Sequence, residues 1–208
     1  SLFSDVGTTE RPDVLAAKVQ EGRIAILVDG TPFALIVPYL FTENFQTLDD
    51  YAHSAFYASF IRIIRYFSFI ISILLPGAYV AISTFHPELL PQALLFNIAA
   101  AEDTTPFPLG IEALIIHLLY EIMREAGLRL PRPVGHAVSI VGALVIGDAA
   151  VTAGLIGAPM IMIVATTAIA SFVVPSLYEP VSVLRFAYIL TGMTLGLYGI
   201  TLLSLLLL

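Results

Sequence analysis

The sequence contains no cysteine, and only 12% of its 208 residues are charged. The lack of cysteine excludes disulfide bridges and thiolate metal sites within this chain. Soluble domains carry about 25% charged residues, so this chain has roughly half of the usual complement. Lysine and arginine together number 9, they are scattered, and the net charge is −7. Because nucleic-acid-binding proteins gather basic residues on one face, the composition argues against that function.

Hydrophobic residues make up 58% of the chain, and the long apolar runs lie after residue 60. This asymmetry predicts a small soluble piece followed by a polytopic α-helical membrane domain. The chain starts without methionine and stops inside an apolar run, so we expect a longer natural protein. We expect three parts, namely the end of a cytosolic soluble domain, a surface linker helix and the membrane domain: residues 1–42, 43–59 and 60–208.

The soluble piece is expected to be a remnant of an α/β domain. Pro12 is suited to open a short helix that runs to about Gln20. Asp29 and Gly30 separate two β-prone runs, and both residue types tolerate the positive φ of a tight turn. The pattern therefore predicts a helix followed by a β-hairpin.

About 20 apolar residues are needed to cross the hydrocarbon core of a bilayer as a helix. Pro76 and Gly77 should kink the first such helix. The stretch 89–101 is too short to span and is interpreted as interfacial or re-entrant. The expected spans are approximately 60–84, 107–123, 134–156, 159–177 and 183–208.

The basic residues predict the orientation, because lysine and arginine favour the cytoplasmic side. Arg62 and Arg65 place the start of the first span, and with it the N-terminal side, in the cytoplasm. The loop 124–133 carries three arginines, which should lie on the same side. The polar segment 107–123 must then cross the membrane.

Asp148 is the only formally charged residue between Pro133 and Pro175. A carboxylate near the bilayer centre costs about 2.5–3.5 kcal/mol on insertion scales. Asp148 should therefore face a water-filled path, where it would attract cations, or lie near the outer interface or against a polar partner. The same predicted helix carries small residues suited to a pore lining or to close packing: Ser139, Gly142, Gly147 and Thr152.

Two further groups of residues are candidates. His117 and Glu121 lie on one helical stripe with Arg124, which could face a vestibule, a partner or a solvated interface. Glu112 lies off this stripe and is expected near the outer surface. The last span carries Gly192 and Gly196, for which helix packing is the favoured interpretation.

The sequence shows no sign of an enzyme. The four histidines lie far apart and no pair has a metal-ligand spacing on one helix, so no metal site is predicted. No nucleophile elbow and no glycine-rich phosphate loop is present. We expect no catalytic residue and no cofactor.

Several blocks, taken in order, resemble the A subunits of GerA-family spore germinant receptors. They are RIAILVDGTPFALIVP at 23–38, LPGAYVAI at 75–82, FHPELLP at 85–91, PFP at 106–108, EIMREAGLRLPRP at 121–133 and VSIVGALVIGDAAV at 138–151. The chain departs from the family pattern at 102–105, where a basic residue is expected, and at Thr152, where an acidic or amide residue is common. A related protein of the SpoVA operon shares the fold, and the blocks fit both.

The resemblance implies a multi-pass protein of the spore inner membrane. Such A subunits work with a transporter-like B subunit, which binds the nutrient, and with a lipoprotein C subunit. The resemblance further implies a homo-oligomer that forms a nutrient-gated ion channel in the lipid bilayer. A non-conducting scaffold of a germination complex is the alternative. A secondary transporter ranks last, because one broken segment occurs near residues 87–106 without a second copy.

Overall fold

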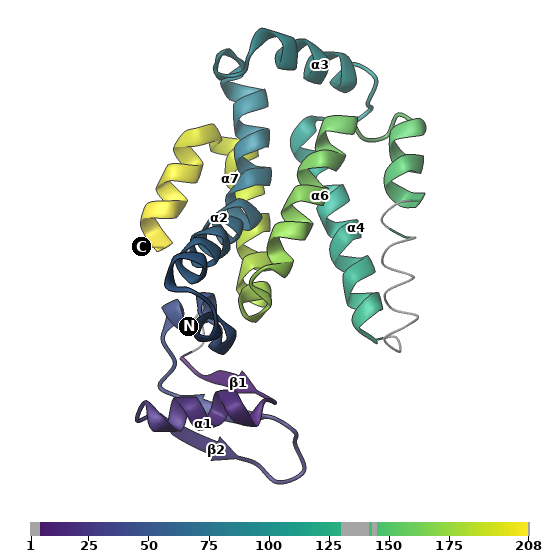
Figure 1. Ribbon diagram of the computed structural model, residues 1–208. Helices are drawn as coiled ribbons and strands as arrows, with labels where there is room; N and C mark the ends of the chain where they lie inside the picture. The colour runs from purple at the N-terminus through teal and green to yellow at the C-terminus, as the bar shows by residue number, and fades with distance from the viewer. Residues whose placement is uncertain (1–4, 130–141, 143–144, 208) are drawn as a thin grey trace. The chain divides into compact units, whose positions relative to one another are not determined.

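The computed structural model describes residues 5–129, 142 and 145–207, and the protein is mainly α-helical. The predicted fold class, mainly α with a small N-terminal α/β piece, is confirmed. The chain forms two compact units, and Figure 1 shows the elements of each. The first unit comprises Ser1–Phe69 and Val173–Pro180, and the second comprises Ile70–Phe172 and Val181–Leu208.

The first unit begins with a three-stranded antiparallel sheet and one helix (Figure 1). Its strands are β1 (Gly7–Thr9), β2 (Ile24–Leu27) and β3 (Ala34–Val37), with β3 in the middle. The loop between β2 and β3 turns at Asp29 and Gly30, where the sequence predicts a hairpin. Helix α1 (Pro12–Gln20) lies against the sheet, and the side chain of Ile36 on β3 is buried.

The linker differs from the single surface helix expected over 43–59. It forms two 3-10 turns, η1 (Phe41–Phe45) and η2 (Leu48–Ala52), before helix α2 begins at Ala55. The reason lies in a capping box. The Asp50 carboxylate accepts hydrogen bonds from the backbone amide and from the hydroxyl of Thr47. Such a box marks the start of a helical segment, so a new turn begins after Thr47.

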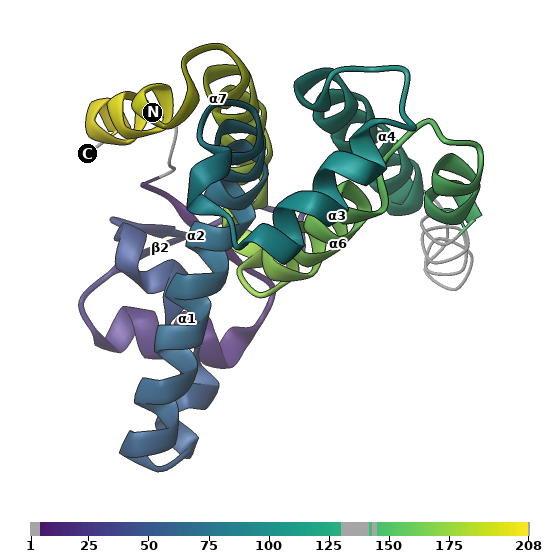
Figure 2. The same ribbon diagram turned by 90° about the horizontal axis from the view of Figure 1, so that it is seen from above.

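The second unit is a bundle of helices around one apolar core. It contains the end of α2 (Ala55–Phe85), then α3 (Gln92–Glu102), α4 (Leu109–Arg129), α6 (Ala158–Phe172) and most of α7 (Tyr178–Leu207). Helix α6 lies beside α4 (Figure 1), and the view from above shows α3 alongside α6 (Figure 2). The core comprises Val80, Leu109, Ala113, Ile116, Ile156, Met160, Val164 and Ile189.

Among the described residues, two helices are long and apolar enough to cross a membrane: Ala55–Phe85 and Pro175–Leu207. The 31 residues of α2 extend about 46 Å at 1.5 Å per residue, more than the hydrocarbon thickness. Helix α6 is apolar but has only 15 residues, and it ends shortly before the turn η4 (Pro175–Leu177). Helix α4 covers the predicted segment 107–123 and continues to Arg129.

The expected span over 134–156 lies largely outside the described residues, and so does Ser139. Its described part is helical over 145–152, and Gly142 is helical as well. A side chain at Gly142 would come within 3.1 Å of Met123 on α4. At Gly147 the nearest atom would belong to Ile161 on α6, at 3.7 Å.

Helix α7 differs from a continuous helix over 183–208, because the chain reverses at Gly196. The dihedral angles of Gly196 are φ 62° and ψ −147°, a combination that essentially only glycine adopts. The hydroxyls of Tyr188 and Ser204 are hydrogen-bonded at 2.9 Å. Sixteen residues of straight helix would hold them about 24 Å apart. The last segment therefore folds back along the preceding one (Figure 1).

Helices α2 and α7 cross at two glycines. A Cβ atom at Gly77 would lie 2.5 Å from the carbonyl oxygen of Tyr188, and one at Gly192 would lie 2.5 Å from that of Gly77. Any side chain at either position would force the backbones apart. Gly192 thus lies at a helix crossing, which agrees with the packing role expected from the sequence, and Gly77, expected at a kink, provides the other side of the same crossing.

Substituting Gly196 should destabilise the second unit. Gly196→Ala places a side chain at a backbone conformation that costs about 1–3 kcal/mol for other residues. The new Cβ would also lie 3.1 Å from the ring of Phe85. We expect a lower Tm for the full-length protein in detergent. Thr194→Ala, an exposed position on the same helix, is the control and should leave Tm unchanged. Equal Tm values for both variants would contradict the need for glycine at the reversal.

Candidate functional site

The polar residues of α4 lie among apolar helices and define the candidate site. His117 and Glu112 are among the most completely buried side chains of the described chain, with exposed fractions of 0% and 1%. Glu121 is partly buried on the same helix. In such surroundings a polar atom without a partner costs free energy, so most of these atoms are expected to bond within the protein. The partners of these three side chains therefore indicate what the site does.

Glu112 caps the start of α6, and its side chain is buried within the second unit. Its Oε1 atom accepts a hydrogen bond of 2.5 Å from the backbone N–H of Gly157. The carbonyl of Gly157 in turn accepts the first amide bonds of α6. A carboxylate is favoured at a helix N-terminus, where amide hydrogens and the helix dipole point outward. Among the described residues, the other carboxylate oxygen of Glu112 has no hydrogen-bond partner.

His117 bonds within its own helix. Its Nδ1 lies 2.9 Å from the carbonyl oxygen of Ala113, one turn earlier. Since a carbonyl only accepts, Nδ1 carries the proton in this contact. The second ring nitrogen, Nε2, is buried and has no partner within the described part of the chain. His117 therefore brings an acceptor into the apolar core.

Glu121 joins α4 to α7. The hydroxyl of Ser182 donates to its Oε1 at 2.5 Å, and Nη1 of Arg185 lies 3.4 Å from the same oxygen. The guanidinium of Arg185 lies 5.9 Å from the centre of the Tyr120 ring, within the range of a cation–π contact. Glu121 on the predicted stripe thus contacts helix α7.

Arg185 is the functional side chain that sequence reasoning missed. In the sequence it stands only as a single arginine near the start of the expected span 183–208. In the structure its exposed fraction is 1%, and its Nε donates to the backbone carbonyl of Ser72 on α2 at 2.9 Å. A cation this deeply buried requires hydrogen-bonding and charged partners on neighbouring helices. Arg185 therefore connects α2, α4 and α7.

Asp148 and Thr152 lie apart from this buried cluster. Both are exposed on the helical stretch 145–152. The exposed residues of the stretch are Val145, Asp148, Ala149 and Thr152. Their spacing of three, one and three residues places them on one helical face. Gly147 is buried and lies toward α6. The exposed face of this stretch therefore carries the carboxylate of Asp148 and the hydroxyl of Thr152.

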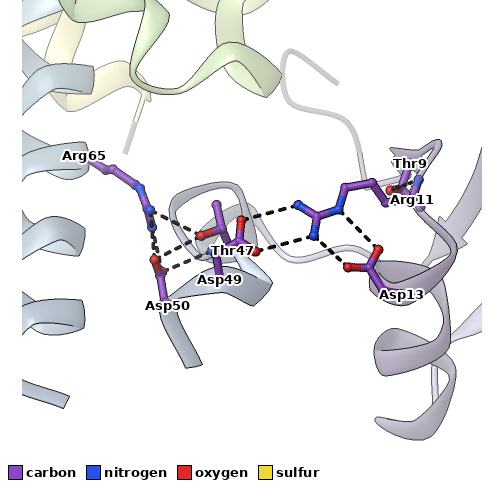
Figure 3. Close-up of polar contacts among 7 residues, drawn as sticks. All are labelled: Thr9, Arg11, Asp13, Thr47, Asp49, Asp50 and Arg65. Carbon is purple, nitrogen blue, oxygen red and sulfur yellow. Dashed lines mark hydrogen bonds and ion pairs between the residues drawn. The ribbon is translucent and has the colours of Figure 1, made fainter. Parts of the chain in front are cut away.

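A second polar cluster lies in the linker of the first unit (Figure 3). Asp50 accepts hydrogen bonds from Arg65 at 2.6 and 2.9 Å and from the amide and hydroxyl of Thr47. Arg62 contributes another contact at 3.3 Å. The Arg65 guanidinium holds the pKa of the buried Asp50 carboxyl below its usual range, although burial acts in the opposite direction. Asp50 thereby anchors the first turns of α2 to the linker.

The same close-up shows a more exposed set of contacts around Arg11 (Figure 3). Arg11 binds Asp13 at 2.6 Å and Asp49 at 3.4 Å, and all three side chains are at least half exposed. Exposed ion pairs contribute little to stability, because water and salt screen them. Within residues 5–129, 142 and 145–207, no group of three histidine or acidic side chains could hold a metal ion.

Comparison with known proteins identifies the family. The family model described as Bacillus/Clostridium GerA spore germination protein matches residues 1–208. Spore germination protein KA of Bacillus subtilis (strain 168) is 52% identical over 204 residues, covering 97% of this chain and 38% of that protein. The uncharacterized membrane protein YfkQ of the same organism is 45% identical over 204 residues, covering 97% and 40%. Spore germination protein GerLA of Bacillus cereus is 44% identical over 204 residues, covering 97% and 42%.

These matches assign the chain to a class of bacterial spore proteins. The chain belongs to the GerA family of spore germination proteins. It spans about two fifths of the length of the curated relatives named above. No solved structure matches the chain. The resemblance noted in the sequence is therefore confirmed at the level of the family.

The linker cluster predicts an acid-sensitive first unit. Because the pKa of Asp50 is lower in the folded than in the unfolded chain, its contribution is present above about pH 4 and is lost as the pH falls further. Asp50→Asn should destabilise the unit at pH 7 by about 3–5 kcal/mol, as for a broken buried pair. Hydrogen exchange over residues 43–69 of the full-length protein measures this.

Asp49→Asn is the matched control, because Asp49 precedes Asp50 and is exposed. It should change exchange little at any pH. The difference between Asp50→Asn and the unmodified protein should shrink as the pH falls below 4, because Asp50 then becomes protonated in the unfolded chain while the folded chain still holds it as a carboxylate. A difference that stays constant from pH 7 to pH 3 would contradict the role of the Asp50 carboxylate.

Proposed function

We propose that the chain is the membrane part of an A-type germinant receptor subunit that oligomerises in the spore inner membrane as a nutrient-gated ion channel. The full-length protein would act with a transporter-like B subunit that binds the nutrient and with a lipoprotein C subunit. Two sets of findings support the germination role: the family match over residues 1–208 and the names of the relatives as spore germination proteins.

A membrane location is supported by the long apolar helix α2, by the apolar segment of α7 and by a relative named as a membrane protein. Arg62 and Arg65 lie near the start of α2, which favours a cytoplasmic position for that end. The linker and sheet of the first unit then belong to the cytoplasmic side. This topology keeps the exposed ion pairs of Arg11 in water, so their charges need not be desolvated.

The observation that carries the channel proposal is the exposed face of the stretch 145–152. A carboxylate on an otherwise apolar helix needs water or a polar partner. The acidic residues of α4 have contacts within the chain, whereas Asp148 points away from the buried side of its stretch. In an oligomer, copies of Asp148 and Thr152 around a common axis would form a polar lining that attracts cations.

A scaffold without its own pore is the second candidate. It is favoured by the buried polar network of α4 and α7, which holds helices together and leaves few polar groups for a conduction path. Under this proposal Asp148 contacts another germination protein. The two candidates differ in what removal of its charge does to ion flux.

Neutralising Asp148 separates the two candidates. Spores carrying Asp148→Asn in the full-length protein should release K⁺ more slowly after addition of a nutrient mixture, because the cation-attracting charge is lost. A potassium electrode measures the release. Asp103→Asn, an exposed acidic position after α3, is the matched control and should have no effect. Normal K⁺ release at normal protein levels would favour the scaffold.

Cysteine accessibility gives a second test of the same face. Single cysteines at 145, 148, 149 and 152 in a cysteine-free full-length protein should react with a water-soluble thiol reagent. A cysteine at 147, on the buried side, should react slowly. A change in reactivity after nutrient addition would locate gating at this stretch. Equal protection at all five positions would contradict a water-filled path there.

A further inference from the structure

Helix α2 contains a proline in its interior, at Pro76. In an uninterrupted helix, the amide hydrogen of residue 76 bonds to the carbonyl of residue 72. Proline has no amide hydrogen, so Pro76 cannot supply this bond. Among apolar helices, water is not available to replace it, and an unmet carbonyl is costly. The break in α2 therefore calls for a donor from elsewhere in the fold.

Arg185 supplies that donor. Its Nε lies 2.9 Å from the carbonyl oxygen of Ser72, and the contact is buried. Ser72 and Arg185 are separated by 113 positions in the sequence. A charged donor forms a stronger hydrogen bond to a carbonyl than a backbone amide does. The bond across helices thus takes the place of the bond that Pro76 removes from within α2.

The rest of the guanidinium reaches α4. Its Nη1 lies 3.4 Å from Oε1 of Glu121, and Ser182 donates to that same oxygen at 2.5 Å. Ser182 and Arg185 lie three residues apart, so both project from the same side of α7. One carboxylate oxygen is therefore shared by two donors of α7. Arg185 is in turn shared by α2 and α4.

The adjacent glycine makes this reach possible. The backbone of α7 approaches α2 at Gly77, next to Pro76, where even a Cβ atom would overlap Tyr188. Gly192 on α7 contributes the other side of the crossing. Arg185 lies one turn before Tyr188, so the crossing brings its side chain to the carbonyl of Ser72. The Pro76-Gly77 pair therefore creates both the acceptor and the space for the donor's helix.

We propose that Arg185 is a positioning residue that replaces the amide of Pro76 and thereby ties the break in α2 to α4 and α7. Pro76 then leaves the Ser72 carbonyl available as an acceptor for Arg185, in addition to its effect on the direction of α2. The three helices move together as long as the guanidinium holds both acceptors. This role does not depend on ion conduction, and it holds for a channel and for a scaffold.

A double-mutant cycle on the full-length protein in detergent tests the proposal. Arg185→Gln should lower Tm by about 5–10 °C, because it breaks a buried charged contact. Pro76→Ala restores an amide that can bond to Ser72 within α2, and this removes the need for Arg185. In the Pro76→Ala background, Arg185→Gln should therefore lower Tm by less than half as much. A role in filling space alone would give equal shifts in both backgrounds.

Arg129→Gln is the matched control, since Arg129 is an exposed arginine near the end of α4. It should leave Tm unchanged whether residue 76 is proline or alanine. If Arg185→Gln does not accumulate, Arg185→Lys completes the cycle. Lysine can reach one acceptor but lacks the fork for two. It should give a smaller shift that also shrinks in the Pro76→Ala background.

Equal shifts for the Arg185 variants in both backgrounds would overturn the proposal. A smaller Tm shift for Arg185→Gln when residue 76 is alanine would support it. The Tm shift of Glu121→Gln should then likewise be smaller when Arg185 is already replaced. Both results stand apart from the K⁺ measurement on Asp148. A non-conducting assembly with strong coupling between Pro76 and Arg185 would refute the channel and leave the positioning role intact.

Discussion

Polar groups that lie among apolar helices must find their hydrogen-bond partners inside the protein, and this constraint organises the second unit. Glu112 is paired with the start of α6, and Glu121 with Ser182 and Arg185 on α7. Arg185 also binds the backbone of α2 at the turn that a proline interrupts. Each of these contacts joins two elements that are distant in sequence. The helices are thus held in specific positions by a few directional contacts, while the apolar core supplies most of the burial.

The first unit depends on a similar contact in a more polar setting. Asp50 lies at the centre of five donor groups from the linker and from the beginning of α2, and its burial makes the carboxylate hard to replace. The aromatic ring of Phe45 stacks on Tyr66 at 4.1 Å beside it. In both units, therefore, an arginine near one end of a long helix receives its orientation from a carboxylate on another element. The arginines that mark membrane topology in the sequence are here also structural ligands.

Much of the fold follows from local signals. Pro12 opens α1, Asp29 and Gly30 separate two strands, and the length of the apolar run predicts α2. The stripe containing His117 and Glu121 was also recognisable, because residues four apart share a helical face. The partner of Glu121 was not, since no local pattern links residue 121 to residue 185. Gly196 looked like a packing glycine, and only the tertiary contact between Tyr188 and Ser204 reveals a reversal. Thr47 and Asp50, three residues apart, carry the local pattern of a capping box, and this pattern accounts for the turn in the linker.

The cap that Glu112 places on α6 limits how that helix can respond to a force. If α6 moved along its axis away from Glu112, the carboxylate would lose its amide donor and would remain as an unpaired anion in apolar surroundings. Pivoting about the capped end keeps the bond while the far end of the helix sweeps sideways. The stretch 145–152, joined to α6 by the short turn before Gly157, would be carried by that same swing. The contact between Glu112 and Gly157 therefore permits α6 to tilt about its first turn and resists its translation along the axis.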